Sequence, residues 1–223
     1  MLIAQQILAG LGSRAPATIA YVSQNSNEAN QASYTFTAQS IGTAASDRFI
    51  LVGVYAPANT NFGNITGVTI GGSPMTQLVQ TEDASGFSDF AVYGLSVPSG
   101  TTADIVVSLS GSPDRLGIDV FRANSLSSTT PTATATLNTA SVDLVQSITV
   151  QSGGIIIGFA GNENTATLHT WTNLTERHDD AIGTGGSSMT GAADAFATGQ
   201  TPSITMAPVT GQSRQALMLV AMR

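Results

Sequence analysis

Hydrophobic and polar residues alternate along most of this chain with the period of two that is typical of β-strands. From residue 19 onward, short apolar runs are separated by Gly, Pro, Ser or Asn. The runs at 48–55 and 155–160 are almost wholly apolar, which predicts central strands covered on both faces. The run at 216–221 predicts a strong closing strand. No long amphipathic helix is expected after residue 18.

Short strands separated by turn residues predict an all-β fold, an antiparallel β-sandwich of jelly-roll or Ig-like type. The loop-like segment 124–132 could join two halves of one sandwich or two small domains. Because neither half clearly shows a full set of strands, we expect a single sandwich domain over residues 19–223. The segment 24–32 also has the composition of an exposed loop.

A glycine pair predicts a hairpin in the first half of the chain. Gly71 and Gly72 stand between the β-type runs 65–70 and 75–81. Two glycines between two such runs favour the tight turn of a β-hairpin. The two runs are therefore expected to pair with each other.

Residues 1–18 form a different kind of segment, a short N-terminal helical or extended arm. Ile3, Ile7, Leu8 and Leu11 have the spacing of one helix face. This face could pack on its own domain or anchor the chain on a neighbouring subunit. The start lacks a basic region and glutamines interrupt its apolar run, so no signal peptide is expected. No run is long enough for a membrane helix.

The composition is poor in charge. Only 9% of the residues are Asp, Glu, Lys or Arg, and none is Lys, whereas an ordinary soluble domain has about 25% charged residues. The formal net charge of −7 argues against binding to nucleic acid or to anionic lipid. The absence of Cys excludes disulfides and thiolate sites. Such a composition suits a surface that is covered by neighbours in a large assembly.

Two polar segments are candidates for metal binding. The cluster 176–180 contains His178, Asp179 and Asp180, and His169 precedes it. Zinc sites need several His or Cys ligands and the chain has two His, so we favour a solvated hairpin whose opposite charges neutralise one another locally. The segment from Asp83 to Asp89 faintly resembles a calcium loop but lacks the ligand pattern of an EF-hand. We expect no metal and no cofactor.

No catalytic constellation stands out, and the chain is not expected to be an enzyme. Ser residues are plentiful, but no G-x-S-x-G elbow or phosphate-binding loop occurs. Sugar-binding modules use exposed aromatic rings as platforms, so Trp171 or Tyr93 could contact a host glycan. A single aromatic ring is more often part of a core, and that alternative is favoured for both.

Three segments carry a resemblance to a known class of proteins. They are RFILVGV at 48–54, VTIGGSPM at 68–75, and YGLSVPSGT at 93–101 followed by DIVV at 104–107. Together they resemble the small β-sandwich virion proteins of tailed bacteriophages and gene transfer agents. The resemblance implies a head-decoration, head-fibre or tail component, and it transfers no catalytic residue to this chain.

Composition and resemblance together predict a non-enzymatic structural protein. We expect a capsid decoration or head-fibre protein, assembled into a virion in the host cytoplasm and anchored through Ile3, Ile7, Leu8 and Leu11. Its expected partners are a major capsid or tail protein and further copies of itself, since most homo-assemblies are symmetric. The alternatives are a tail or tail-fibre component, or a carbohydrate-binding module that contacts host surface glycans.

Overall fold

The computed structural model describes residues 14–58, 63–139, 143–163, 169–183, 186–208 and 214–223 of the chain. This part is all-β, as predicted, and all its strand pairs are antiparallel. The sheets divide the chain into an N half, which ends with the strand at 116–124, and a C half, which begins with the strand at 133–138. We call residues 125–132 between them the connector. No helix in the described residues could cross a membrane.

The N half forms two sheets. The inner N sheet has the order β1-β9-β3-β7-β6 and the outer N sheet the order β2-β8-β4-β5. The strands are β1 (Thr18–Asn27), β2 (Ser33–Ser40), β3 (Phe49–Pro57), β4 (Ile65–Ile70), β5 (Ser73–Pro74), β6 (Thr76–Glu82), β7 (Ser88–Ser96), β8 (Thr102–Leu109) and β9 (Leu116–Asn124).

The C half repeats this arrangement. The inner C sheet has the order β10-β17-β12-β15-β14 and the outer C sheet the order β11-β16-β13. The strands are β10 (Ala133–Asn138), β11 (Leu144–Ser147), β12 (Gly154–Glu163), β13 (His169–Thr172), β14 (Glu176–Ile182), β15 (Ser187–Phe196), β16 (Ser203–Pro208) and β17 (Arg214–Met222).

The two halves have the same strand order. For this comparison the strands of each half are counted in chain order, without β5. Across the inner sheet of each half the order is then first, last, third, sixth and fifth. The second, seventh and fourth strands form the outer sheet. This is close to the connectivity of a jelly roll, with the fifth strand in the inner sheet. The chain therefore contains two sandwiches of one topology, and β5 is the short piece of the fifth strand that stays in the outer N sheet.

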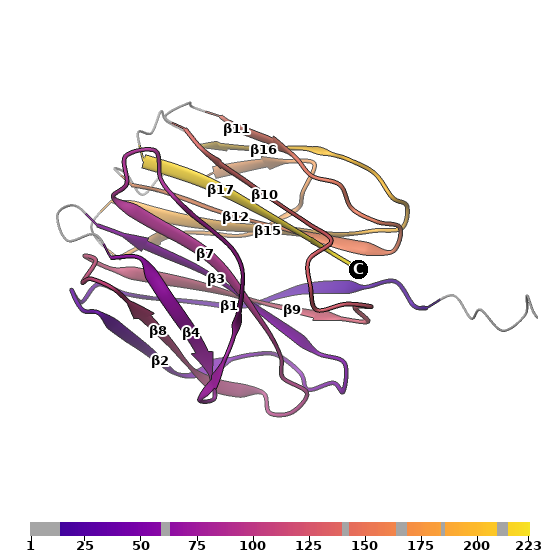
Figure 1. Cartoon of the computed structure of the whole chain (residues 1–223), viewed down its shortest axis with the longest axis horizontal. Coiled ribbons are helices and arrows are strands. Elements are labelled where there is room, and N and C mark those ends of the chain that lie inside the picture. The colour runs from indigo at the N-terminus through magenta and orange to yellow at the C-terminus, as the bar shows by residue number, and fades with distance from the viewer. Residues whose placement is uncertain (1–13, 59–62, 140–142, 164–168, 184–185, 209–213) are drawn as a thin grey trace, which may run out of the picture.

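The four sheets are stacked as four layers, with the two inner sheets in the middle (Figure 1). Side chains of alternating strand positions fill three separate hydrophobic cores, one between each pair of neighbouring layers. In β3, Leu51 and Tyr55 face the inner C sheet, whereas Val52 and Val54 face the outer N sheet. Tyr34 and Phe36 of β2 cover these from the outer side. The prediction of doubly covered strands is confirmed for β3 and β12, which are buried along their whole length.

The predicted hairpin at the glycine pair is only partly confirmed. Gly71 and Gly72 have φ angles of 56° and 80°, the left-handed values that a two-residue hairpin turn requires. The strand that returns is β5, which is only two residues long. After the buried Met75 the chain crosses to the inner N sheet, where β6 pairs with β7. The turn is therefore confirmed, but β4 pairs with Ser73 and Pro74, and the expected pairing of residues 65–70 with 75–81 was wrong.

Two of the loop expectations have different outcomes. The connector is a loop, as expected, although its Leu126 is buried. The segment 24–32 was expected to be a loop, but β1 continues to Asn27 and pairs with β9 as far as Leu116. An edge strand needs backbone hydrogen bonds on one side only, so polar residues are compatible with it. The single domain expected over residues 19–223 stays a prediction, because it concerns whether the two sandwiches unfold together.

One glycine sets how closely the two inner sheets approach. A Cβ atom at Gly53 of β3 would lie 2.6 Å from the ring of Phe159 of β12. At Gly67 of β4, by contrast, a Cβ atom would meet nothing within 4 Å. Gly53 therefore makes room for the Phe159 ring in the core between the halves.

We predict that Gly53→Ala destabilises the protein and that Gly67→Ala does not. The added methyl group must displace the Phe159 ring, and overpacking of this kind costs about 1–3 kcal/mol. Chemical denaturation of both variants measures the difference in unfolding free energy. Equal stabilities of the Gly53→Ala variant and the unchanged protein would contradict this account of the inner-sheet contact.

Candidate functional site

The charged cluster of β14 is paired with partners on three other strands. Arg177 contacts Asp194 of β15 at 3.0 Å, and His178 lies 3.1 Å from Asp119 of β9. Asp179 contacts His169 at 2.8 Å. The hairpin is present, since β14 pairs with β15, and Glu176, Arg177 and Asp180 are exposed. The expectation of local neutralisation was wrong, because successive residues of a strand point to opposite faces and meet different neighbours.

The Asp119–His178 pair joins the two halves inside the protein. The Asp119 side chain is completely buried and that of His178 is 10% exposed. The ring of Tyr21 of β1 stacks on the imidazole, with 5.5 Å between the ring centres. A Cβ atom at Gly191 of β15 would lie 2.9 Å from a carboxylate oxygen of Asp119, so this glycine leaves room for the pair.

Burial and charge shift the pKa values of this pair. Burial raises the pKa of Asp119, and the nearby His178 partly opposes that rise. Burial alone would lower the pKa of His178, but the carboxylate of Asp119, with the charges of Asp180 and Asp179, raises it above its ordinary value. A charged imidazole is thus the partner that compensates the buried carboxylate.

A second buried polar chain starts at Asp179. Its carboxylate contacts Nδ1 of His169, and Nε2 of His169 lies 2.6 Å from the side-chain nitrogen of Asn162. The oxygen of that Asn162 amide accepts a hydrogen bond of 3.2 Å from Ser188. An acid–histidine pair can activate a hydroxyl nucleophile, but here the second ring nitrogen meets an amide. This geometry fits a cross-link between strands of the C half.

The carboxylates of the candidate calcium loop are hydrogen-bonded by other groups of the fold. One oxygen of Asp83 accepts hydrogen bonds from the backbone of Ser85 and Phe87. Asp89 is fully buried and accepts from the backbone of Ile65 and from the Gln80 amide. Burial raises the pKa of Asp89 to about 6. Both carboxylates thus already fulfil roles in the fold.

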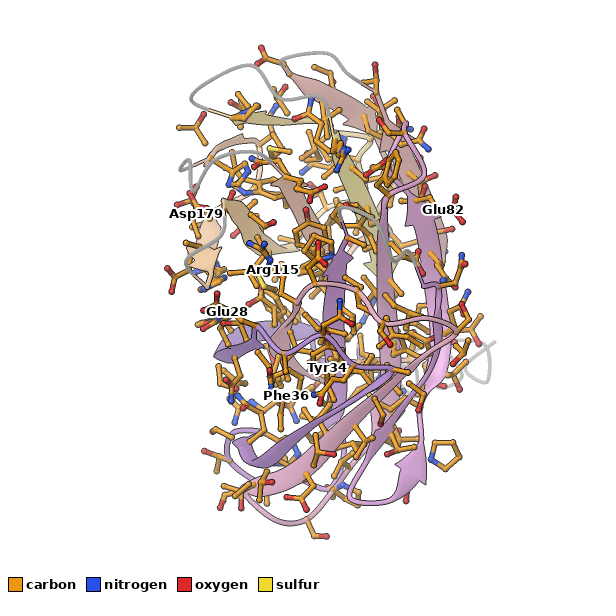
Figure 2. The ribbon with its side chains drawn as sticks, turned by 90° about the vertical axis from the view of Figure 1, so that its left-hand side faces the viewer. Glu28, Tyr34, Phe36, Glu82, Arg115 and Asp179 are labelled. Atoms are coloured by element: carbon orange, nitrogen blue, oxygen red, sulfur yellow. The ribbon has the colours of Figure 1, made fainter. Side chains whose placement is uncertain are left out.

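The two acidic segments are also far from each other. Figure 2 shows Asp179 and Glu82 at opposite margins of the molecule. Within the described part of the chain, no three His, Asp or Glu side chains are grouped so that they could hold a metal ion.

The two aromatic candidates for glycan contact lie largely inside the sandwiches. Tyr93 of β7 is 3% exposed, belongs to the core between the N sheets, and its hydroxyl group donates a hydrogen bond of 3.2 Å to Gln77. Trp171 of β13 is half-buried against the core between the C sheets, and its Nε1 donates to Thr190. Trp171 is the more accessible of the two rings.

The predicted anchor residues Ile3, Ile7, Leu8 and Leu11 lie outside the described residues. The described chain starts at Arg14, whose guanidinium group donates a hydrogen bond to the carbonyl group of Leu126 in the connector. Ala17 is buried, and its backbone nitrogen donates to Gly153 of the C half at 2.8 Å. Residues 14–17 are thus tied to the connector and to the C half, although the sequence analysis assigned them to the arm.

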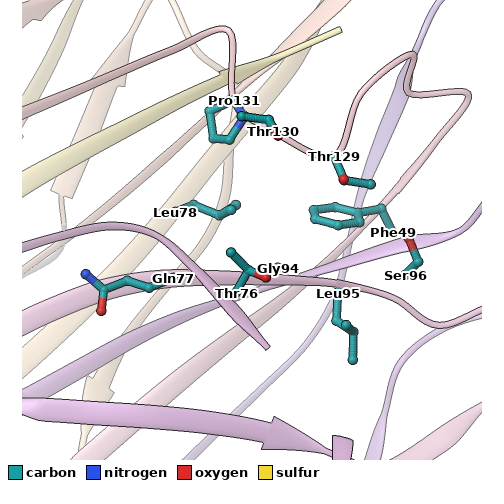
Figure 3. A pocket seen from close by; sticks show the side chains of 10 residues that line it. All are labelled: Phe49, Thr76, Gln77, Leu78, Gly94, Leu95, Ser96, Thr129, Thr130 and Pro131. Carbon is teal, nitrogen blue, oxygen red and sulfur yellow. The ribbon is translucent and has the colours of Figure 1, made fainter. Parts of the chain in front are cut away.

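A pocket of about 420 Å³ lies where the connector passes the inner N sheet (Figure 3). We call it the connector groove. The side chains of Phe49, Leu78, Thr129 and Pro131 lie on one side of β7, and Leu95 points to the other side. The remaining lining residues are Thr76, Gln77, Gly94, Ser96 and Thr130. The sequence analysis missed this groove, because its walls come from segments far apart in the chain.

The comparisons with known proteins give little. No protein-family model matches the chain, and no curated protein is significantly similar to it. Among solved structures it is similar to the crystal structure of PBSX exported protein XepA, with 10% sequence identity over 92% of this chain and 86% of that chain. The TM-score of 0.21 is too low to establish a common fold.

The Asp119–His178 pair predicts a pH dependence of stability. The pKa of His178 is raised in the folded protein, so its contribution is complete below the unfolded value of about 6.5 and is lost as the pH rises through the raised folded pKa. The raised pKa of Asp119 acts in the same direction. We expect His178→Gln to lower the unfolding free energy by about 3–5 kcal/mol at pH 6, because it leaves a buried carboxylate without its cation.

Denaturation curves from pH 6 upward measure this effect. The decline in stability should disappear when His178→Gln is combined with Asp119→Asn, because this pair of changes removes both groups whose raised pKa values cause it. It should persist in His169→Gln, a change at the other histidine of the chain. An unchanged pH slope in the double variant would show that the pair does not control it.

Proposed function

We propose that this chain is a non-enzymatic structural component of a phage-like virion, anchored through its N-terminal arm. Because residues 14–17 are tied to the body of the protein, the name arm is used from here on for residues 1–13 of the predicted segment 1–18. A capsid decoration or head-fibre role fits best, with a tail component as the alternative. The observation that carries the proposal is the surface of the protein. Among the described residues, Val145 is the one large hydrophobic side chain that is strongly exposed. Five of the few charged residues are buried: Arg48, Asp83, Asp89, Asp119 and Glu163.

A surface that is neither charged nor apolar suits close neighbours at fixed positions. Free proteins use mixed surface charge to stay dispersed, and this chain has only 9% charged residues before the buried ones are subtracted. Jelly-roll sandwiches serve as capsid and lectin domains. The resemblance of the segments at 48–54, 68–75 and 93–107 to virion proteins favours the first of these uses.

The arm is the proposed source of the apolar contact with the particle. Its four apolar residues, Ile3, Ile7, Leu8 and Leu11, share the spacing of one helix face. Full burial of one such side chain contributes about 1.5–3 kcal/mol. In this proposal the face packs on a major capsid or tail protein, and copies of the chain are arranged around a symmetry axis of the particle.

The test is incorporation into particles purified from the host that produces them. We expect removal of residues 1–13 to abolish incorporation and to leave the fold intact, because Arg14 and Ala17 remain in place. A single Leu8→Ser change should reduce incorporation by about tenfold or more. Gln5→Ser on the polar side of the arm is the matched control. Normal incorporation of the truncated chain, with an unchanged circular dichroism spectrum, would refute anchoring by the arm.

A carbohydrate-binding role is the second candidate, favoured by the partial exposure of Trp171 on β13, an edge strand of the outer C sheet. We expect host surface glycans to bind the unchanged chain and, if the ring is the platform, Trp171→Phe to retain more binding than Trp171→Leu. Glycan-array binding, with the unfolding curve of each variant as control, measures this. An array without any bound glycan would remove this candidate.

A further inference from the structure

We infer that the connector groove is the docking site of the chain's own arm, residues 1–13, before the protein meets a particle. The groove has half-buried apolar side chains at Leu78 and Pro131, and the arm carries four apolar residues with the spacing of one helix face. This goes beyond the proposed virion role and does not rest on it. The proposal names an intramolecular contact, so it holds or fails in the isolated protein.

The first argument is where the described chain begins. Arg14 is hydrogen-bonded to Leu126 of the connector, and Thr129, which lines the groove, follows three residues later. Three residues of extended backbone span at most about 11 Å, and thirteen residues span about 20 Å as a helix or up to about 45 Å when extended. The arm therefore starts beside the groove and is long enough to reach every part of it.

The second argument is the construction of the groove. Gly94 of β7 has no side chain, and a Cβ atom there would lie 2.4 Å from the ring of Phe49 and 3.1 Å from Leu78. Leu78 is the extra residue of a β-bulge between Gln77 and Val79 of β6. Bulges redirect side chains next to binding sites. The glycine makes room for the Phe49 ring in the floor of the groove, and the bulge places the side chain of Leu78 beside it.

The third argument is that the wall of the groove is fixed. The backbone nitrogens of Ser127 and Ser128 donate hydrogen bonds of 2.8 Å and 2.9 Å to the carbonyl oxygen of Arg223. Pro131 follows Thr129 and Thr130 along the connector and completes this wall of the groove (Figure 3). A helix with an apolar face is a common occupant of a preformed groove of this kind, and the sequence of the arm is compatible with such a helix.

The arm is expected to dock in the groove of its own chain, because the two are joined by a short tether. A short tether holds the two partners at millimolar effective concentration, so an internal contact forms before a contact with a second copy. Ile3, Ile7, Leu8 and Leu11 are then covered while the chain is free. The same residues become available when a particle offers a better partner surface.

Cysteine cross-linking in the full chain tests the contact, because the chain has no native Cys. Ala4→Cys leaves the four apolar arm residues in place, and Thr129→Cys puts the second thiol on the groove wall. The matched control pairs Ala4→Cys with Ser108→Cys, an exposed position on β8 of the outer N sheet. We expect the Thr129 pair to cross-link within the monomer about tenfold faster than the Ser108 pair.

Two further variants show whether the groove is responsible. Leu78→Asp places a charge in the groove and should reduce the cross-linking rate of the Thr129 pair to that of the control pair. Val145→Asp, a comparable change at an exposed site on β11, should leave the rate unchanged. Unfolding curves of all variants confirm that the sandwiches are intact.

Three outcomes would overturn the proposal. These are equal rates for the Thr129 and Ser108 pairs, no effect of Leu78→Asp, or a cross-linked dimer as the main product. The dimer would mean that the arm occupies the groove of a second copy. Failure of particle incorporation is a separate result, because this cross-linking needs no particle.

Discussion

The contact between the two inner sheets is the interaction on which the rest of the structure depends. Each inner sheet is covered on both faces, so β3 and β12 bury side chains in both directions. Leu51, Phe121, Phe159 and Met218 meet in the core between the halves. Because strand side chains alternate, the same strands also supply the two outer cores. A change in the spacing of the inner sheets therefore affects all three cores.

This contact also places the features that bear on function. The Asp119–His178 pair crosses it, and Ala17 enters its core beside Gly153. The connector is held by hydrogen bonds to Arg223, the last residue after β17. Packing of the halves thus fixes the point from which residues 1–13 leave the fold and the position of the groove next to it. In the proposed virion role, this geometry gives a rigid body with one attachment segment.

The sequence predicted the strand class and the doubly covered strands because their signals are local. Alternation and long apolar runs are visible in residues 48–55 and 155–160 without knowledge of the partner. The second sandwich was not predicted, because a doubly covered strand has the same pattern whatever covers it. The common topology of the two halves was not visible in the sequence either. The runs ILVGVYA and IIIGFAG read alike, but Gly53 faces Phe159 between the halves and Gly158 faces Trp171 in the outer direction.

The candidate site was less predictable, since it depends on contacts between distant segments. The partners of His178 and Asp179 come from β9 and β13. The strand β15 is rich in Gly, Ala and Ser, and its small residues allow the close approach of Asp119 and Phe121 at Gly191. A pattern of small residues between strong strands was the one signal that could have indicated tight packing there.

The most direct test of the central claim is unfolding in denaturant, followed by two probes at once. Trp171, the single Trp of the chain, reports on the C half by fluorescence, and far-UV circular dichroism reports on both halves. If the inner-sheet contact makes the halves one cooperative unit, both probes give a single transition with the same midpoint. Two transitions, with the fluorescence change confined to one of them, would contradict this account.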